Sequence, residues 1–311
     1  MYEIIVQHFV QNVNSYFRKA SERRFTRMDK MLLQKIRDIK EISQLEQFEY
    51  DNKLFIDPYR INGTQNAILQ SAKTKIIRFF DLFFESVENK DRNLAENIGQ
   101  HLHEINATKL GYCAVFDDPK GKGFSQRDLL FIFDEAIKVK ADITDMPDIL
   151  MLAERIGPDK VSDLTTNIIY EELLEFTKGI IAKYNLKIPI QKTNKWVFDV
   201  EKTVWIKKEI DVPYIDEKEI LFLPNGIVAG YELFSYEVIY KKEIYPFLKN
   251  NPAIHNLVRL LKDGEKVTDC KKLKKHFPQT RATVKYFKKT FPDRYERYKT
   301  EMQNDYWRHR Y

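Results

Sequence analysis

The 311-residue sequence predicts an α/β or α+β fold, in which a helical N-terminal half leads into strands and then into a basic helical C-terminal region. Three observations support this prediction. Apolar residues recur at helical spacing through the first half of the chain. From 185 to 240 they alternate or form short β-branched runs between turn residues. From 241 onward helical spacing returns with a large excess of lysine and arginine. We therefore expect a body over 1–240 and a separate basic region over 241–311.

The strongest helical pattern spans Asn66–Val87, whose apolar side chains fall on one broad face. This pattern predicts a helix at the centre of the core. Ile169 begins another periodic run, and Ser162 or Asp163 before it offers the side-chain oxygen that a helix N-cap needs. Similar spacing predicts further helices over 2–45, 126–139, 146–154, 253–262, 268–276, 280–290 and 293–302.

Short apolar and β-branched runs predict the strands. A run at 54–56 is closed by Asp57-Pro58, which favours a turn. The remaining runs are separated by proline and glycine and lie at 196–198, 204–206 and 220–223.

Composition excludes several classes of protein. The only cysteines, Cys113 and Cys270, lie far apart and form neither a disulfide framework nor a zinc motif. The first residues lack the basic segment and small-residue cleavage site of a signal peptide. No apolar run approaches the roughly 18 residues that a membrane span needs. We expect a cytoplasmic protein with no membrane partner.

The net charge of +6 conceals a strong asymmetry along the chain. Residues 241–311 contain 19 Lys and Arg against 8 Asp and Glu, whereas the rest of the chain contains 33 against 38. An acidic body with a basic terminal region indicates contact with nucleic acid. The alternative is an ordinary solvated surface rich in lysine.

The densest group of small polar residues lies at Ile156–Asn167, which reads I-G-P-D-K-V-S-D-L-T-T-N. Gly157-Pro158 favours a turn, so a helix should begin close after it. The N-terminus of a helix can hold a phosphate, and neighbouring carboxylates can instead hold Mg²⁺. Helix capping alone would account for Ser162 and Asp163, but it leaves the Thr-Thr-Asn run unexplained.

A magnesium site in this stretch would support hydrolysis of phosphodiesters. Asp159 and Asp163 are the expected ligands, with Asp57 or Glu104 as a third carboxylate. Lys160 would hold a phosphate beside them, assisted by Thr166. We assign Asp159, Lys160, Asp163 and Glu104 as candidate catalytic residues.

The segment 267–287 resembles a helix-turn-helix unit of DNA-binding proteins. Such a unit inserts the start of its second helix into the major groove. That would place Arg281, Thr283 and Lys285 against bases, with Lys288 and Lys289 near phosphates. The segment departs from the usual pattern because it has Lys274 at the small-residue position and Pro278 instead of the turn glycine. Use of the unit for packing, or for a protein partner, is an equal alternative.

Three strings also resemble a group of poorly characterised bacterial proteins associated with anti-phage defence or mobile elements. They are L-F-I-D-P at 54–58, G-P-D-K-V-S-D-L-T-T-N-I-I at 157–169 and I-L-F-L-P at 220–224. The resemblance implies a nucleic-acid context, with DNA favoured over RNA. Two functions follow as hypotheses: a metal-dependent nuclease, or a non-catalytic DNA-binding or complex-forming subunit of a multi-protein defence system.

Overall fold

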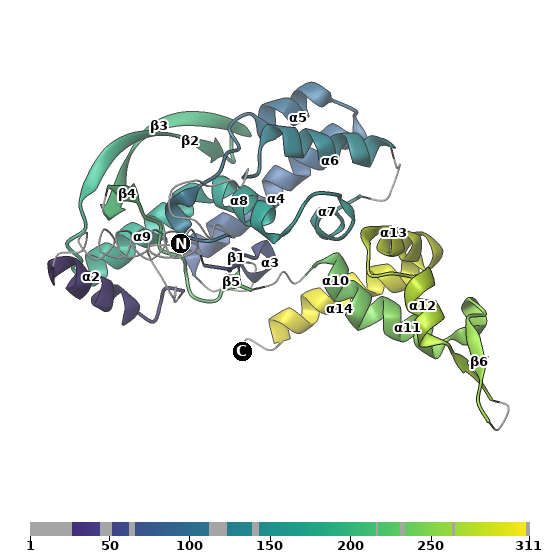
Figure 1. Cartoon of the computed structure of the whole chain (residues 1–311). Coiled ribbons are helices and arrows are strands. Elements are labelled where there is room, and N and C mark those ends of the chain that lie inside the picture. Colours follow the sequence, from purple (N-terminus) through teal and green to yellow (C-terminus); the bar gives the residue numbers. More distant parts are fainter. Residues whose placement is uncertain are drawn as a thin grey trace, which may run out of the picture.

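The computed structural model describes residues 27–43, 52–61, 66–111, 123–138, 143–215, 217–230, 234–262 and 265–308. Helices form most of the body, and a long β-hairpin arches over them (Figure 1). The described strands pair only antiparallel, apart from one isolated parallel bridge between Asn52 and Leu110. Parallel β-α-β units are thus absent from the described part of the chain, and the fold is α+β.

Helix α4 (Ala67–Glu88) forms the centre of the body, as its apolar pattern predicts. Asn66 caps its first turn by accepting hydrogen bonds from the N–H groups of Ile68 and Leu69. Phe79 and Phe83 are fully buried. The helices that surround α4 are α3 (Pro58–Ile61), α5 (Arg92–Gly99), α6 (Gln126–Lys138), α8 (Pro158–Ile168) and α9 (Tyr170–Lys183).

The polar stretch at 156–167 forms a helix of its own, which corrects the expected cap. Helix α8 begins at Pro158, with Gly157 as its N-cap, so Ser162 and Asp163 lie within the helix. A break at Ile169 separates α8 from α9. Proline suits the first turn of a helix because an N–H at that position would have no partner within the helix. This preference explains why the helix starts at Pro158, before the expected cap at Ser162 or Asp163.

Strands β2 (Ile190–Asp199) and β3 (Val204–Ile215) form the long hairpin, which short strand β4 (Lys218–Glu219) extends. The indole N–H of Trp205 donates to the carbonyl of Ile98 at 2.8 Å and anchors the end of the hairpin. Strands β1 (Phe55–Ile56) and β5 (Val228–Ala229) pair elsewhere. The run at 220–223 is buried but contains no strand, contrary to the prediction.

The C-terminal region begins with one continuous helix made of three segments. These are α10 (Tyr236–Ile239), a π-helical turn (Tyr240–Ile244) and α11 (Tyr245–Asn250). The helix expected over 253–262 is wrong. Only Pro252–Ile254 is helical, and a hairpin of β6 (Val258–Leu260) and β7 (Lys266–Thr268) follows. Asn256 has a left-handed φ of 54°, which breaks a helix at this point.

Three helices complete the region: α12 (Cys270–His276), α13 (Arg281–Thr290) and α14 (Pro292–Arg308). Helix α13 packs against α7 (Met146–Leu152) of the body, and the β6–β7 hairpin projects away from it (Figure 1). Ile149 and Leu152 of α7 belong to the same buried apolar cluster as Val284 and Phe287 of α13. Within the described residues, no helix combines the length and apolarity needed to cross a membrane.

Candidate nucleic-acid interface

Hydrogen bonds within the body account for the polar run in α8. Ser162 accepts a hydrogen bond from the N–H of Ile56 at 3.0 Å, and Thr166 donates to the carbonyl of Ser162 at 2.7 Å. Asn167 donates to the carbonyl of His103 at 2.6 Å and accepts from its N–H at 3.3 Å. Ser162, Thr166 and Asn167 are all buried. These side chains therefore join α8 to neighbouring segments.

Two of the predicted catalytic residues, Glu104 and Asp163, lie close to Gly123. A Cβ atom added at Gly123 would lie 2.5 Å from the Glu104 Cβ and 2.9 Å from the Asp163 Oδ2. The N–H of Phe124 donates to that same Asp163 oxygen at 3.3 Å. Gly123 is required here because any side chain would collide with both residues. The segment 112–122 that leads into this position lies outside the described residues.

Lys160 and Asp159 lie one turn before Asp163. Lys160 forms an ion pair with Asp128 of α6, so its charge has a partner within the body. Asp159 is half-buried, and burial raises its pKa above the usual range. No hydrogen-bond or ion-pair partner for Asp159 is found in the described part of the chain.

Asp57 has a different role from the predicted one. It is buried, accepts a hydrogen bond from the N–H of Tyr59 at 3.0 Å and lies 3.5 Å from the Arg60 Nε. These contacts are typical of an aspartate that stabilises the turn into a short helix, here α3. Over the described ranges no three His, Cys, Asp or Glu side chains are grouped as a metal site requires. The assignment of magnesium to Asp57, Asp159 and Asp163 stays a prediction.

The predicted recognition helix, α13, turns three of its basic side chains toward the body. Lys288 forms an ion pair with Asp148 at 2.7 Å. Arg281 donates to the carbonyl of Ile156, at the entrance to α8. Lys285 lies 3.8 Å from a Glu135 carboxylate oxygen. We call Arg281, Lys285 and Lys288, together with Lys299 of α14, the docked face.

Asp148 is the centre of the docked face and is fully buried. Besides Lys288 it accepts hydrogen bonds from Thr144 at 2.8 Å and from the Tyr295 hydroxyl at 2.9 Å. Lys299 is 3.5 Å away and also pairs with Asp145 at 2.8 Å. Burial alone would raise the pKa of Asp148, but the charges of Lys299 and Lys288 outweigh it and lower the pKa.

Thr283 and Lys289, the other two residues predicted to contact nucleic acid, differ in their exposure to solvent. Thr283 is buried and its N–H donates to the hydroxyl of Thr280, the N-cap of α13. It therefore cannot reach a base while α13 is packed in this way. Lys289 is exposed, and the described residues provide no partner for it.

A second basic surface lies on α12 and the β6–β7 hairpin, and the predicted site did not include it. Its side chains are exposed, and the contacts found within the described residues are weak: Lys272 lies 3.9 Å from Asp269, and Lys274 lies over the Tyr245 ring. The acidic residues that the structure describes within 258–276 are Glu265 and Asp269. We call this surface the open face, which consists of Arg259, Lys262, Lys266, Lys271, Lys272, Lys274, Lys275 and Lys289.

The sequence contains a signal for the open face. Leu273 is the one buried residue of α12, and lysines surround it on both sides. A short helix with a single apolar contact exposes the rest of its circumference, so most of these lysines had to face solvent.

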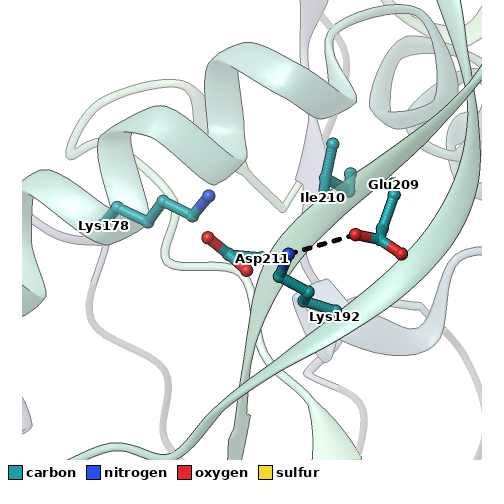
Figure 2. Close-up of a pocket in the computed structure, with 5 residues that line it drawn as sticks. All are labelled: Lys178, Lys192, Glu209, Ile210 and Asp211. Atoms are coloured by element: carbon teal, nitrogen blue, oxygen red, sulfur yellow. Dashed lines mark hydrogen bonds and ion pairs between the residues drawn. The ribbon is translucent and has the colours of Figure 1, made fainter.

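A shallow hollow of about 270 Å³ lies between α9 and the β2–β3 hairpin (Figure 2). Lys192 and Glu209 pair at 3.2 Å at its rim. The hollow mixes both signs of charge and contains none of the residues predicted from sequence; its lining is Lys178, Lys192, Glu209, Ile210 and Asp211.

Comparison with known proteins identifies a family for the body of the chain. The model of a family described as a domain of unknown function (DUF8370) matches residues 45–235, more than half of the chain. The match ends one residue before α10, so the open face lies outside it. No curated protein and no solved structure matches. The chain belongs to the DUF8370 family.

Proposed function

We propose that the protein binds nucleic acid through the open face, as a non-catalytic DNA-binding subunit. The observation that supports this most strongly is the row of exposed lysines on α12, which the body leaves without strong ion pairs. Nucleic acid carries condensed cations along its phosphates, and exposed lysines release these cations when they bind the phosphates.

The charge of the two parts of the chain favours one orientation of the bound nucleic acid. Residues 1–240 have an excess of acidic residues, and residues 241–311 have a large excess of basic residues. A polyanion is therefore repelled by the body and attracted to the C-terminal region. The hairpin extends the basic surface away from the body (Figure 1), which lets a strand contact it without approaching the acidic part.

Nuclease activity is the second candidate function, and it is favoured by Glu104 and Asp163, which both lie beside Gly123. A metal-dependent reaction would need at least one further ligand beside this pair. Asp57 does not supply it, because its oxygens are engaged in the turn before α3. We therefore place binding before cutting.

The test measures binding of labelled DNA and RNA, single-stranded and duplex, to the full chain by fluorescence anisotropy over a range of salt. Replacing Lys271, Lys272, Lys274 and Lys275 by glutamine should weaken binding strongly. It should also reduce the slope of log affinity against log salt by up to about 3, since each phosphate contact contributes roughly 0.7–0.9.

The matched control replaces four exposed lysines on the β2–β3 side of the body by glutamine: Lys187, Lys192, Lys202 and Lys207. It has the same net charge as the α12 variant and should keep most of the affinity and the slope. Equal losses in both variants, or no binding by the native protein at low salt, would contradict the proposal. Parallel incubation with Mg²⁺ or EDTA, read on a denaturing gel, detects cutting and would favour the nuclease.

A further inference from the structure

An exposed aromatic group lies within the open face. Tyr286 of α13 is 45% exposed, and its ring centroid is 5.4 Å from that of Phe277. His276, at the end of α12, is also exposed, and its ring lies 4.7 Å from Phe277 at a steep angle. Phe277 itself is buried. Two exposed rings thus flank one buried ring where α12 and α13 meet.

Packing does not account for Tyr286. Its ring contacts Phe277 and yet remains 45% exposed, and its hydroxyl has no hydrogen bond to any described residue. The two other large aromatic side chains of similar exposure among the described residues are stacked on another ring or hydrogen-bonded. Trp196 stacks on His101 with centroids 3.7 Å apart, and Tyr184 donates to Glu41 at 2.7 Å. Tyr286 therefore combines an exposed ring with a hydroxyl that bonds to no described residue.

Cations lie on both sides of this aromatic group. Lys289 is three residues after Tyr286 on α13, and Lys272 is four residues before His276 on α12. Residues at these spacings lie on one face of a helix, about one turn apart. Lys275 adjoins His276 directly. Among the described residues, the only acidic side chain on α12 or its cap is Asp269, at the far end of the helix.

Aromatic rings between cations distinguish single strands from duplexes. In a duplex the flat faces of the bases are stacked on each other, and only the phosphates and base edges are accessible. In a single strand each base can stack on an exposed side-chain ring while lysines hold the adjacent phosphates. A ring and cations one helical turn apart on each side match this arrangement.

We propose that the open face binds single-stranded nucleic acid with a base stacked on Tyr286. This inference rests on the proposed function, because the lysines of the open face supply the phosphate contacts. It names the class of nucleic acid, which the charge of the surface alone does not specify. His276 provides a second ring for the next base.

The test uses three substitutions at one position, with single-stranded and duplex oligonucleotides of the same length. Tyr286→Phe keeps the ring, Tyr286→Leu keeps apolar bulk without a ring, and Tyr286→Ala removes both. Binding is measured at low salt, and the denaturant midpoint of each variant checks folding. Loss of one stacked base corresponds to roughly a fivefold to hundredfold drop in affinity.

Tyr286→Leu and Tyr286→Ala should lower the affinity for the single strand by a factor in this range. Tyr286→Phe should bind the single strand about as tightly as the native protein. Duplex binding should change little in all three. Photo-cross-linking of an iodouracil-containing single strand should place the adduct on Tyr286 by mass spectrometry. Equal losses for both substrates, or an unchanged Ala variant, would overturn the inference but leave the proposed function standing. Absence of any nucleic-acid binding by the native protein would remove both.

Discussion

Helix α13 separates two basic surfaces that have similar residues and opposite surroundings. On the docked face, Lys288 and Lys299 meet the buried carboxylate of Asp148, and Lys299 also pairs with the partly exposed carboxylate of Asp145. On the open face, the lysines of α12 meet mainly solvent. The comparison teaches that a cation is available to a ligand only where the same chain does not supply its counter-ion. Charge counted along a sequence cannot separate the two cases.

The two surfaces should also contribute differently to the free energy of folding. Ion pairs removed from water are costly to break, because the remaining charge is left buried without a partner. Exposed cations gain little from nearby acids, since water and salt screen them. Stability should therefore depend on the docked face and binding on the open face, and each prediction below tests that division.

The largest effect is expected at Asp148. Asp148→Asn removes the charge that holds Lys288 and Lys299, and it should lower the free energy of unfolding by about 3–5 kcal/mol. Guanidinium unfolding followed by circular dichroism measures it. Glu209→Gln breaks the exposed pair with Lys192 and serves as the control, with an expected change of roughly 0–1 kcal/mol. Similar changes in the two variants would show that the docked face stabilises the protein no more than an exposed ion pair does.

The contribution of Asp148 to the free energy of unfolding should be lost as the pH falls. The nearby lysines hold the pKa of Asp148 below its usual range in the folded protein. Its stabilising contribution is therefore complete above the unfolded pKa of about 3.9 and is lost as the pH falls through the lower folded value. The stability difference between the native protein and Asp148→Asn should be largest near neutral pH and shrink in acid. A difference that grows on acidification would contradict this account.

A pair of methionine substitutions compares the two surfaces directly. Lys288→Met removes a docked cation and should cost about 1.5–3 kcal/mol of stability, the value of hydrogen bonds to charged groups. The slope of nucleic-acid affinity against salt should not change. Lys272→Met removes an open cation and should reduce that slope by about 0.7–0.9 without lowering stability. Measuring both quantities on both variants shows whether the two faces are as separate as their surroundings indicate.

The smallest effect is expected at Asp269, which caps α12 by accepting hydrogen bonds from the N–H groups of Lys271 and Lys272. Asp269→Asn keeps the cap and removes one of the two acids on the open face. Nucleic-acid affinity should rise by roughly twofold with the unfolding midpoint unchanged. Asp269→Ala gives the same gain in charge but also loses the cap, so it should lower the midpoint. An affinity that falls in the Asn variant would argue against phosphate contact at α12.

Much of the fold could be predicted from the sequence because local periodicity determines it. The apolar face of 66–87 predicted α4, and the β-branched runs at 196–198 and 204–206 predicted strands where β2 and β3 lie. The errors occurred where a tertiary partner decided between local alternatives. The segment 253–262 has apolar residues at helical spacing, yet Val258 pairs with Thr268 across a hairpin. Strand pairing joins residues distant in sequence, and no local pattern contains that information.

The candidate site was less predictable. The sequence by itself determined that the C-terminal region is basic and largely helical. Only the tertiary structure decided which side of α13 meets the body. A helical pattern identifies the buried stripe of a helix, but it does not identify the carboxylates that a neighbouring segment brings to the remaining faces. Asp148 lies 140 residues from Lys288 in sequence, and it takes up a cation that the sequence alone assigned to phosphate.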